Sequence, residues 1–118
     1  MPSLIPSEHE EQVTFVEWLE TKGYKFSAIP NGWFGNIGLI KKMQKEGVRA
    51  GVPDMFIIVK DHLVWIEMKK KDLKPKRGGK GGVSDEQWRW IDALNRCDNC
   101  QAYVCYGADE AIKVIESI

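Results

Sequence analysis

Two strand-like runs separated by only three residues constrain the fold of this chain more than any other feature. Asp54–Val59 and Leu63–Lys69 are rich in β-branched and aromatic residues, and Lys60, Asp61 and His62 connect them. A connection this short is typical of a β-hairpin. Both runs are apolar at alternate and intervening positions alike, which favours strands covered on two faces by helices. The sequence therefore predicts a central hairpin within an α/β domain.

Helix and strand signals surround this hairpin. Ser7 with Glu10, and Ser84 with Gln87, form capping-box patterns that predict the starts of two helices, and Gly23 predicts the end of the first. The expected helices are 8–22, 37–46, 84–96 and 108–118, and the expected strands are 24–29, 54–59, 63–69 and 101–106. The order αβαββαβα predicts a mixed β-sheet flanked by helices.

Length and composition indicate one folded domain spanning residues 1–118. Hydrophobic residues make up 43% and charged residues 29% of the chain, which excludes a disordered class. No apolar run approaches the roughly 18 residues of a membrane span, and the first residues lack a signal-peptide pattern. We expect a cytoplasmic protein whose three cysteines are reduced.

Two charged residues interrupt the second run of the hairpin. Glu67 and Lys69 are two positions apart, so they share one face of a strand. In a hairpin the start of the first strand, at Asp54, lies beside the end of the second, near Glu67. Because an isolated buried charge is costly, these groups need one another or a cation. Paired carboxylates suit Mg²⁺, and the lysine could orient or deprotonate a water or steady charge developing on phosphorus.

A basic segment follows the hairpin directly. Residues 69–80 carry seven basic groups and one acid, although the net charge of the whole chain is zero. Such a segment attracts polyanions, or it is a solvated loop that keeps the protein soluble. The glycine-rich run from Gly78 to Ser84 lacks the register of a phosphate-binding P-loop, so we expect no nucleotide cofactor.

These residues resemble a known family. Pro53-Asp54 followed by Glu67-Met68-Lys69 is similar to the PD-(D/E)XK nuclease signature, and the wider pattern resembles the VRR-NUC branch in its standalone phage or prophage form. The wider pattern consists of Ser7-Glu8, Gln12, Trp18, Ile29-Pro30-Asn31-Gly32, the run Gly47–Asp54, Ile66–Lys69, Ser84 with Gln87, and Tyr106-Gly107 with Ala111. The chain departs from the family in its longer, lysine-rich basic segment and in an aromatic insertion, Trp33-Phe34.

The resemblance implies a restriction-endonuclease-like fold and a phosphodiesterase that uses Mg²⁺ or Mn²⁺. It implies metal ligands at Asp54, Glu67 and the backbone carbonyl of Met68, a catalytic Lys69, and a further carboxylate from the first helix. A family glutamine maps to Gln87, which the sequence assigns equally well to the helix cap. Trp33 and Phe34 are either a packing cluster or a wedge against unstacked bases.

Two acids of the first helix compete for the place beside the metal. We favour Glu8 over Glu11, because Glu8, Gln12, Phe15 and Leu19 fall on one stripe and Gln12 could hold the Glu8 carboxylate. The expected catalytic set is therefore Glu8, Asp54, Glu67, Lys69 and Gln87. The expected DNA-binding residues are Asn31, Arg49, Lys70, Lys71, Lys74, Lys76, Arg77 and Lys80.

Together these features predict a metal-dependent DNA endonuclease that leaves a 5′-phosphate and a 3′-hydroxyl, as the family does. A domain of 118 residues has little surface with which to grasp a duplex, so we expect a homodimer acting on branched DNA, such as a four-way junction, within a bacterial host cell. The alternatives are a nuclease for flaps or nicks and a catalytically idle DNA-binding module. Metal dependence separates the idle module from the enzymes.

Overall fold

The computed structural model describes residues 4–30 and 36–118. Asn31, Trp33 and Phe34 lie outside these residues, so their expected roles stay predictions. The elements are α1 (Glu8–Lys22), β1 (Lys25–Ala28), α2 (Ile37–Lys45), β2 (Met55–Val59), β3 (His62–Lys69), a short 3-10 helix η1 (Lys71–Leu73), α3 (Asp85–Asn95), β4 (Cys100–Tyr106) and α4 (Ala108–Glu116). Apart from η1, this is the predicted order αβαββαβα.

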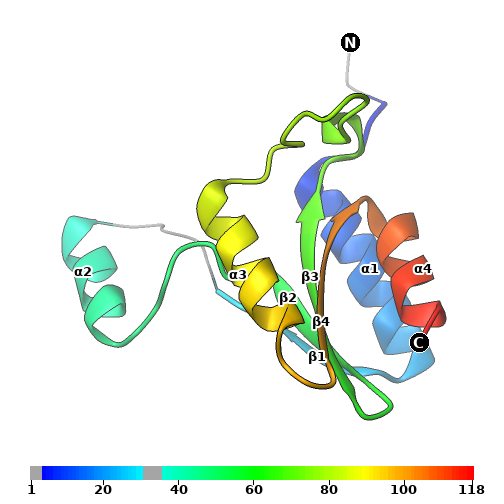
Figure 1. The fold of residues 1–118 in the computed structure, drawn as a ribbon, viewed down its shortest axis with the longest axis horizontal. Helices are drawn as coiled ribbons and strands as arrows, with labels where there is room; N and C mark the ends of the chain where they lie inside the picture. The colour runs from blue at the N-terminus through cyan, green and yellow to red at the C-terminus, as the bar shows by residue number, and fades with distance from the viewer. Residues whose placement is uncertain (1–3, 31–35) are drawn as a thin grey trace.

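The four strands form one mixed sheet in the order β1-β2-β3-β4. The pairs β1–β2 and β2–β3 are antiparallel, and β3–β4 is parallel. The hairpin turn has two residues and not the expected three, because His62 already pairs with Val59. Lys60 accommodates this tighter turn with a positive φ of 57°. Helices α1 and α4 lie together on one side of the sheet and α3 on the other (Figure 1).

Burial alternates along β2, where Met55, Ile57 and Val59 are buried while Ile58 is 45% exposed. The expectation that both faces of this strand are covered is therefore wrong at Ile58. The end of β3 differs, because all four residues from Ile66 to Lys69 are buried. Both faces of the sheet are thus covered where Glu67 and Lys69 lie.

Helix caps place the helix starts where the sequence predicts them. The Ser7 hydroxyl accepts from the Glu10 N–H at 3.1 Å, and the Glu10 carboxylate accepts from the Ser7 N–H at 3.1 Å. Gly23 ends α1 in the left-handed conformation that glycine favours, with φ of 80°. These local signals fix the direction in which α1 enters the fold.

Helix α2 stands away from the rest of the molecule (Figure 1). None of its residues is buried. The radius of gyration is 15.0 Å, against about 13.5 Å for a compact chain of this length. In the part of the chain that the structure describes, no helix is long and apolar enough to cross a membrane.

Candidate active site

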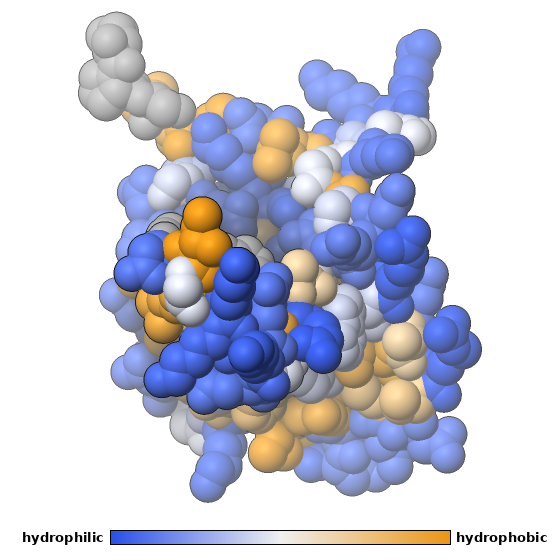
Figure 2. All heavy atoms as spheres, turned by 90° about the vertical axis from the view of Figure 1, so that its left-hand side faces the viewer, coloured by the Kyte–Doolittle hydropathy of each residue, from blue (hydrophilic) through white to orange (hydrophobic). Residues whose placement is uncertain are grey.

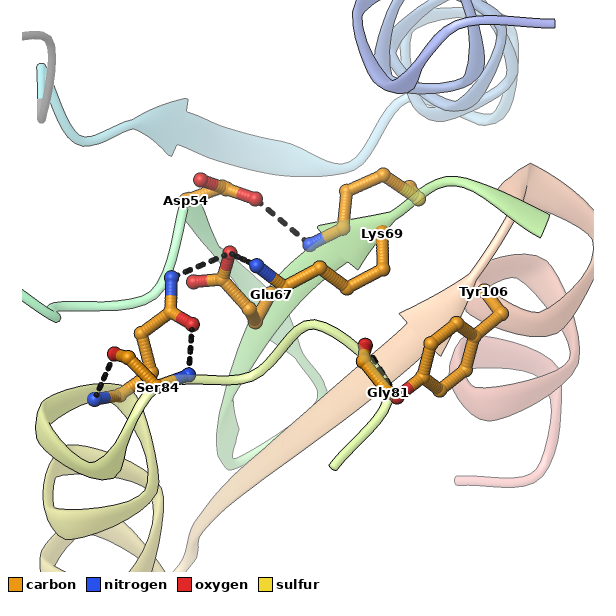
Figure 3. A network of polar contacts seen from close by, with 8 residues as sticks. Asp54, Glu67, Lys69, Gly81, Ser84 and Tyr106 are labelled. Atoms are coloured by element: carbon orange, nitrogen blue, oxygen red, sulfur yellow. Dashed lines mark hydrogen bonds and ion pairs between the residues drawn. The ribbon is translucent and has the colours of Figure 1, made fainter. Parts of the chain in front are cut away.

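The hairpin brings Asp54 to the end of β3. Asp54 directly precedes β2, whose first residue, Met55, pairs with Ile66. The Asp54 carboxylate accepts a hydrogen bond from the Met68 N–H at 2.7 Å (Figure 3). Its backbone carbonyl accepts from the Ile29 N–H at 2.7 Å, after the end of β1. Both neighbouring strands therefore fix Asp54 in place.

Glu67 and Lys69 point from β3 toward Asp54, as their spacing predicts (Figure 3). The Lys69 ammonium nitrogen lies 3.8 Å from the nearer oxygen of Glu67. Both residues are almost fully buried, with 2% of Glu67 and 8% of Lys69 exposed. Two charged side chains thus occupy an otherwise apolar strand end, where each offsets part of the desolvation cost of the other.

Gln87 both caps α3 and contacts the acidic cluster, the two roles between which the sequence does not choose. Its side-chain oxygen accepts from the Ser84 N–H at 2.9 Å, which completes the capping box of α3. Its side-chain nitrogen donates to the Glu67 carboxylate at 3.4 Å (Figure 3). The cap therefore orients the amide so that its donor faces the acidic cluster.

Glu8 and Glu11 lie in different surroundings. Oxygens of Glu8, Asp54 and Glu67 all lie within 4.8 Å of one another, so these three carboxylates could share a metal ion. Glu11 instead accepts from the Ala108 N–H at 3.2 Å, at the start of α4. Gln12, which the stripe argument placed beside Glu8, lines a hollow with His9 and Val13. The buried stripe of α1 consists of Glu11, Phe15 and Leu19.

The three clustered carboxyls all have raised pKa values. Burial, followed by repulsion from Asp54, raises the pKa of Glu67 to about 9. Burial raises the pKa of Asp54, although the hydrogen bond from Met68 opposes that shift. Burial and then repulsion from Asp54 raise the pKa of Glu8. Without another cation, the cluster favours protons over full ionisation.

This donor set fits a divalent cation. Three carboxylates within reach of one centre supply the hard oxygen ligands of Mg²⁺ or Mn²⁺. Lys69 is the single ammonium group that the structure places beside Glu67 in the cluster, so the cluster carries an excess of negative charge when ionised. The N–H of Met68 is bonded to Asp54, and a metal contact by the Met68 carbonyl stays a prediction.

The basic segment is tied down more than the sequence predicts. Besides Lys69, which pairs with Glu67, four lysines of the segment lie within ion-pair distance of acidic side chains. The partners are Asp72 for Lys70 (3.6 Å), Glu11 and Asp109 for Lys71 (3.6 and 3.8 Å), Glu110 for Lys74 (2.6 Å) and Asp85 for Lys80 (3.7 Å). Lys76 and Arg77 make no ion pair within residues 4–30 and 36–118. These two cations are therefore the free ones of the segment.

A tyrosine of β4 also anchors this segment. The Tyr106 hydroxyl donates to the Gly81 carbonyl at 3.0 Å (Figure 3). Gly81 has φ of 59°, and any Cβ there would overlap the Tyr106 hydroxyl. No local pattern predicts this contact, because the two residues are 25 positions apart. Arg49, the other expected DNA contact, donates to the carbonyls of Gln44 and Val48 at the end of α2.

Comparisons with known proteins bear on the sequence and on the fold. The sequence model of the VRR-NUC domain matches residues 6–109 of this chain. A solved structure described as a VRR_NUC domain protein superimposes with a TM-score of 0.72 and 23% sequence identity, covering 95% of this chain and 87% of that one. At this identity the superposition shows a shared fold. No curated protein matches the chain.

Proposed function

The chain belongs to the VRR-NUC domain family of PD-(D/E)XK nucleases, and we propose that it is a divalent-metal-dependent endonuclease that hydrolyses phosphodiester bonds of branched DNA. The observation that carries this proposal is the convergence of Glu8, Asp54 and Glu67 beside Lys69. A purely structural ion pair needs one carboxylate for one ammonium group. Three carboxylates with raised pKa values within reach of one centre exceed that need and support a cation site.

Each residue of the cluster has a role in the proposed hydrolysis. A bound Mg²⁺ or Mn²⁺ would supply Lewis acidity and would lower the pKa of a water. Asp54, Glu67 and Glu8 would hold the ion, and Gln87 orients the Glu67 carboxylate through its 3.4 Å contact. Lys69 faces the same space and orients the attacking water or stabilises the charge on phosphorus. The water gives up a proton to solvent as its oxygen bonds to phosphorus, the bond from phosphorus to the 3′-oxygen breaks, and that oxygen takes up a proton from solvent.

A homodimer is part of this proposal, because α2 buries none of its residues within one chain. Isolated helices shorter than about 12–15 residues are marginal in water, and α2 has nine residues, none of them buried. Its apolar side chains include Ile37, 72% exposed, and Leu39, 45% exposed. Figure 2 views the molecule from this side and shows apolar atoms standing among hydrophilic ones on the part nearest the viewer.

We propose that a second copy of this chain packs against the exposed side of α2. An apolar hollow of about 180 Å³ lies beside the base of α2, lined by Ile29, Pro30, Gly47, Val48, Arg49, Val52 and Trp90. Because the hollow and the projecting helix are neighbours on one chain, a two-fold axis between two copies can lay each helix on the hollow of the other. Such a dimer presents two active sites, as cleavage of paired strands in a junction requires.

Polar substitution of the helix tests this dimer. We expect Ile37→Glu with Leu39→Glu to weaken self-association at least tenfold, because charges replace the apolar contact. Val13→Glu with Ile58→Glu is the matched control, since these side chains are 41% and 45% exposed on α1 and β2. Sedimentation over a concentration series measures both variants. A wild-type protein that stays monomeric, or two variants that behave alike, would contradict the interface.

The free cations of the basic segment predict a salt-dependent affinity for DNA. Each phosphate neutralised contributes about 0.9 to the slope of log K against log salt. Replacing Lys76 and Arg77 with serine should therefore flatten the slope by about two units, while single-turnover cleavage at saturating enzyme hardly changes. Lys22→Ser with Lys25→Ser is the matched control, because these lysines lie at the end of α1 opposite Glu8 and at the start of β1. Binding is measured in Ca²⁺, and an unchanged slope would show that these cations are solvated bystanders.

A cleavage assay tests the proposed function directly. We expect four-way junctions to be cut in Mg²⁺ or Mn²⁺ and to survive in EDTA. Preferred cutting of flaps or nicks would assign the second kind of substrate, and binding without cutting in either metal would identify the idle module. From the resemblance to standalone phage or prophage members of the family, we also propose that a phage or prophage encodes the protein and that it acts in the cytoplasm of the bacterial host.

A further inference from the structure

Glu11 is a buried charge that the proposed metal site does not use. Only 4% of the residue is exposed. One carboxylate oxygen accepts from the Ala108 N–H at 3.2 Å, and the other lies 3.6 Å from the Lys71 ammonium nitrogen. Burying an ionised carboxylate is costly unless directed contacts compensate. An apolar residue at this position would leave the Ala108 N–H without this acceptor and would remove one acidic partner of Lys71.

The partners of Glu11 belong to two other parts of the fold. Ala108 begins α4, whose positive dipole end favours a carboxylate. Lys71 lies two residues after Lys69, and the Gly107 N–H donates to the Lys69 carbonyl at 3.1 Å. Gly107 has φ of 102°, and a Cβ there would come within 2.9 Å of the Glu11 carboxylate. Glu11 thus joins α1 to the start of α4 and to η1, which follows β3.

These contacts of Glu11 lie at the end of α1 that carries Glu8. The buried residues of α1 are Glu11, Phe15 and Leu19, so Glu11 is the only buried anchor in the first turn. Glu8 is three positions earlier and shares the same side of the helix. An apolar anchor allows the helix to slide or rotate, whereas the hydrogen bond from Ala108 and the ion pair with Lys71 restrict its rotation about its own axis. Within the described residues, the oxygen that faces Lys71 has no hydrogen-bond partner, so the Ala108 N–H is the directed contact.

We propose that Glu11 is a positioning residue that holds the first turn of α1 so that the Glu8 carboxylate stays within reach of Asp54 and Glu67. This inference rests on the proposed metal site. It assigns Glu11 a role distinct from ligation, because one of its oxygens accepts from Ala108 and the other faces Lys71, away from the carboxylate cluster.

Metal binding without DNA measures this positioning. We expect Glu11→Ala to weaken Mn²⁺ binding by about tenfold, the size typical of groups that orient metal ligands. Glu11→Gln should weaken it less than threefold, because its side-chain oxygen can still accept from Ala108. In a Glu8→Gln background, Glu11→Ala should cause no further loss, because the ligand through which Glu11 acts is already gone. Calorimetric titration of the full chain gives all of these affinities.

Two controls separate positioning from general stability. Ile115→Val shortens a buried side chain of the same α4 helix and should lower the melting temperature without changing Mn²⁺ affinity. Asp109→Asn removes the exposed second partner of Lys71 and should also leave affinity unchanged. Normal Mn²⁺ binding by Glu11→Ala, or an equal loss in both Glu8 backgrounds, would overturn the proposal while the metal site stands. Normal binding by Asp54→Asn would instead overturn the metal site, and the positioning role with it.

Discussion

Asp54→Asn and Glu67→Gln are each expected to reduce DNA cleavage by at least about 10³-fold, or about 4 kcal/mol in the activation free energy. Each change keeps the shape of the side chain and removes one of the negative charges that hold the cation. Asp54 also orients its carboxylate through Met68, a contact that asparagine can still make with its carbonyl oxygen. The loss should therefore lie in metal binding and turnover and not in folding.

The stability of the metal-free variants provides the control. Glu67 has a pKa of about 9 in the folded protein, against 4.5 for the ordinary side chain. The folded state thus binds this proton more tightly than the unfolded state, and the resulting stability is present below pH about 4.5 and is lost as the pH rises toward 9. The side chain of the Glu67→Gln variant is neutral in both the folded and the unfolded state, so this variant has no such loss of stability. In EDTA at pH 8 it should therefore melt at a higher temperature than the wild type.

Three observations would count against this assignment. Wild-type turnover by either variant at saturating Mg²⁺ would show that the cluster is not the active site. A metal-free wild type whose melting temperature does not fall between pH 5 and 9 would show that Glu67 is ionised without a cation. A similar gain in melting temperature for Glu17→Gln, an exposed acid of α1, would show that the effect belongs to the net charge and not to the cluster.

The central part of the fold could be predicted because its signals are local. The spacing of Glu67 and Lys69 fixes a shared face on any strand, and a short connection brings Asp54 beside them whether the turn has two residues or three. The capping box likewise predicts the orientation of Gln87, since Ser84 is only three positions away. The spacing of charged residues on a strand, the short hairpin connection and the capping residues were therefore sufficient to predict these parts of the structure.

The contacts that the sequence did not predict join distant segments. Glu11 meets Ala108 across 97 positions, and Lys74 meets Glu110 across 36. A charge run read alone predicts a loose cationic loop, because it contains no information about acids from another helix. The α1 stripe was misassigned for a related reason, since Glu11 is more polar than Gln12 and its burial depends on partners from α4 and η1, Ala108 and Lys71.

Lys69→Met should lower the single-turnover cleavage rate by about 10²- to 10⁴-fold, the range of a positioned group acting in proton transfer, while affinity for junction DNA in Ca²⁺ changes less than about threefold. Methionine preserves the apolar stem, which is buried with the rest of the side chain, and removes only the ammonium group beside Glu67. Lys25→Met, on exposed β1, is the control for the loss of one positive charge.

The comparison of rate with affinity decides what the ammonium group does. A phosphate anchor would lower affinity and rate together, because its contact exists before the reaction begins. A group that acts on the attacking water or on the charged phosphorus interacts most strongly in the transition state, so its removal lowers the rate at saturating enzyme. Since Lys69 lies on the buried face of β3, 3.8 Å from a proposed metal ligand, and not with the exposed cations Lys76 and Arg77, we expect the second result.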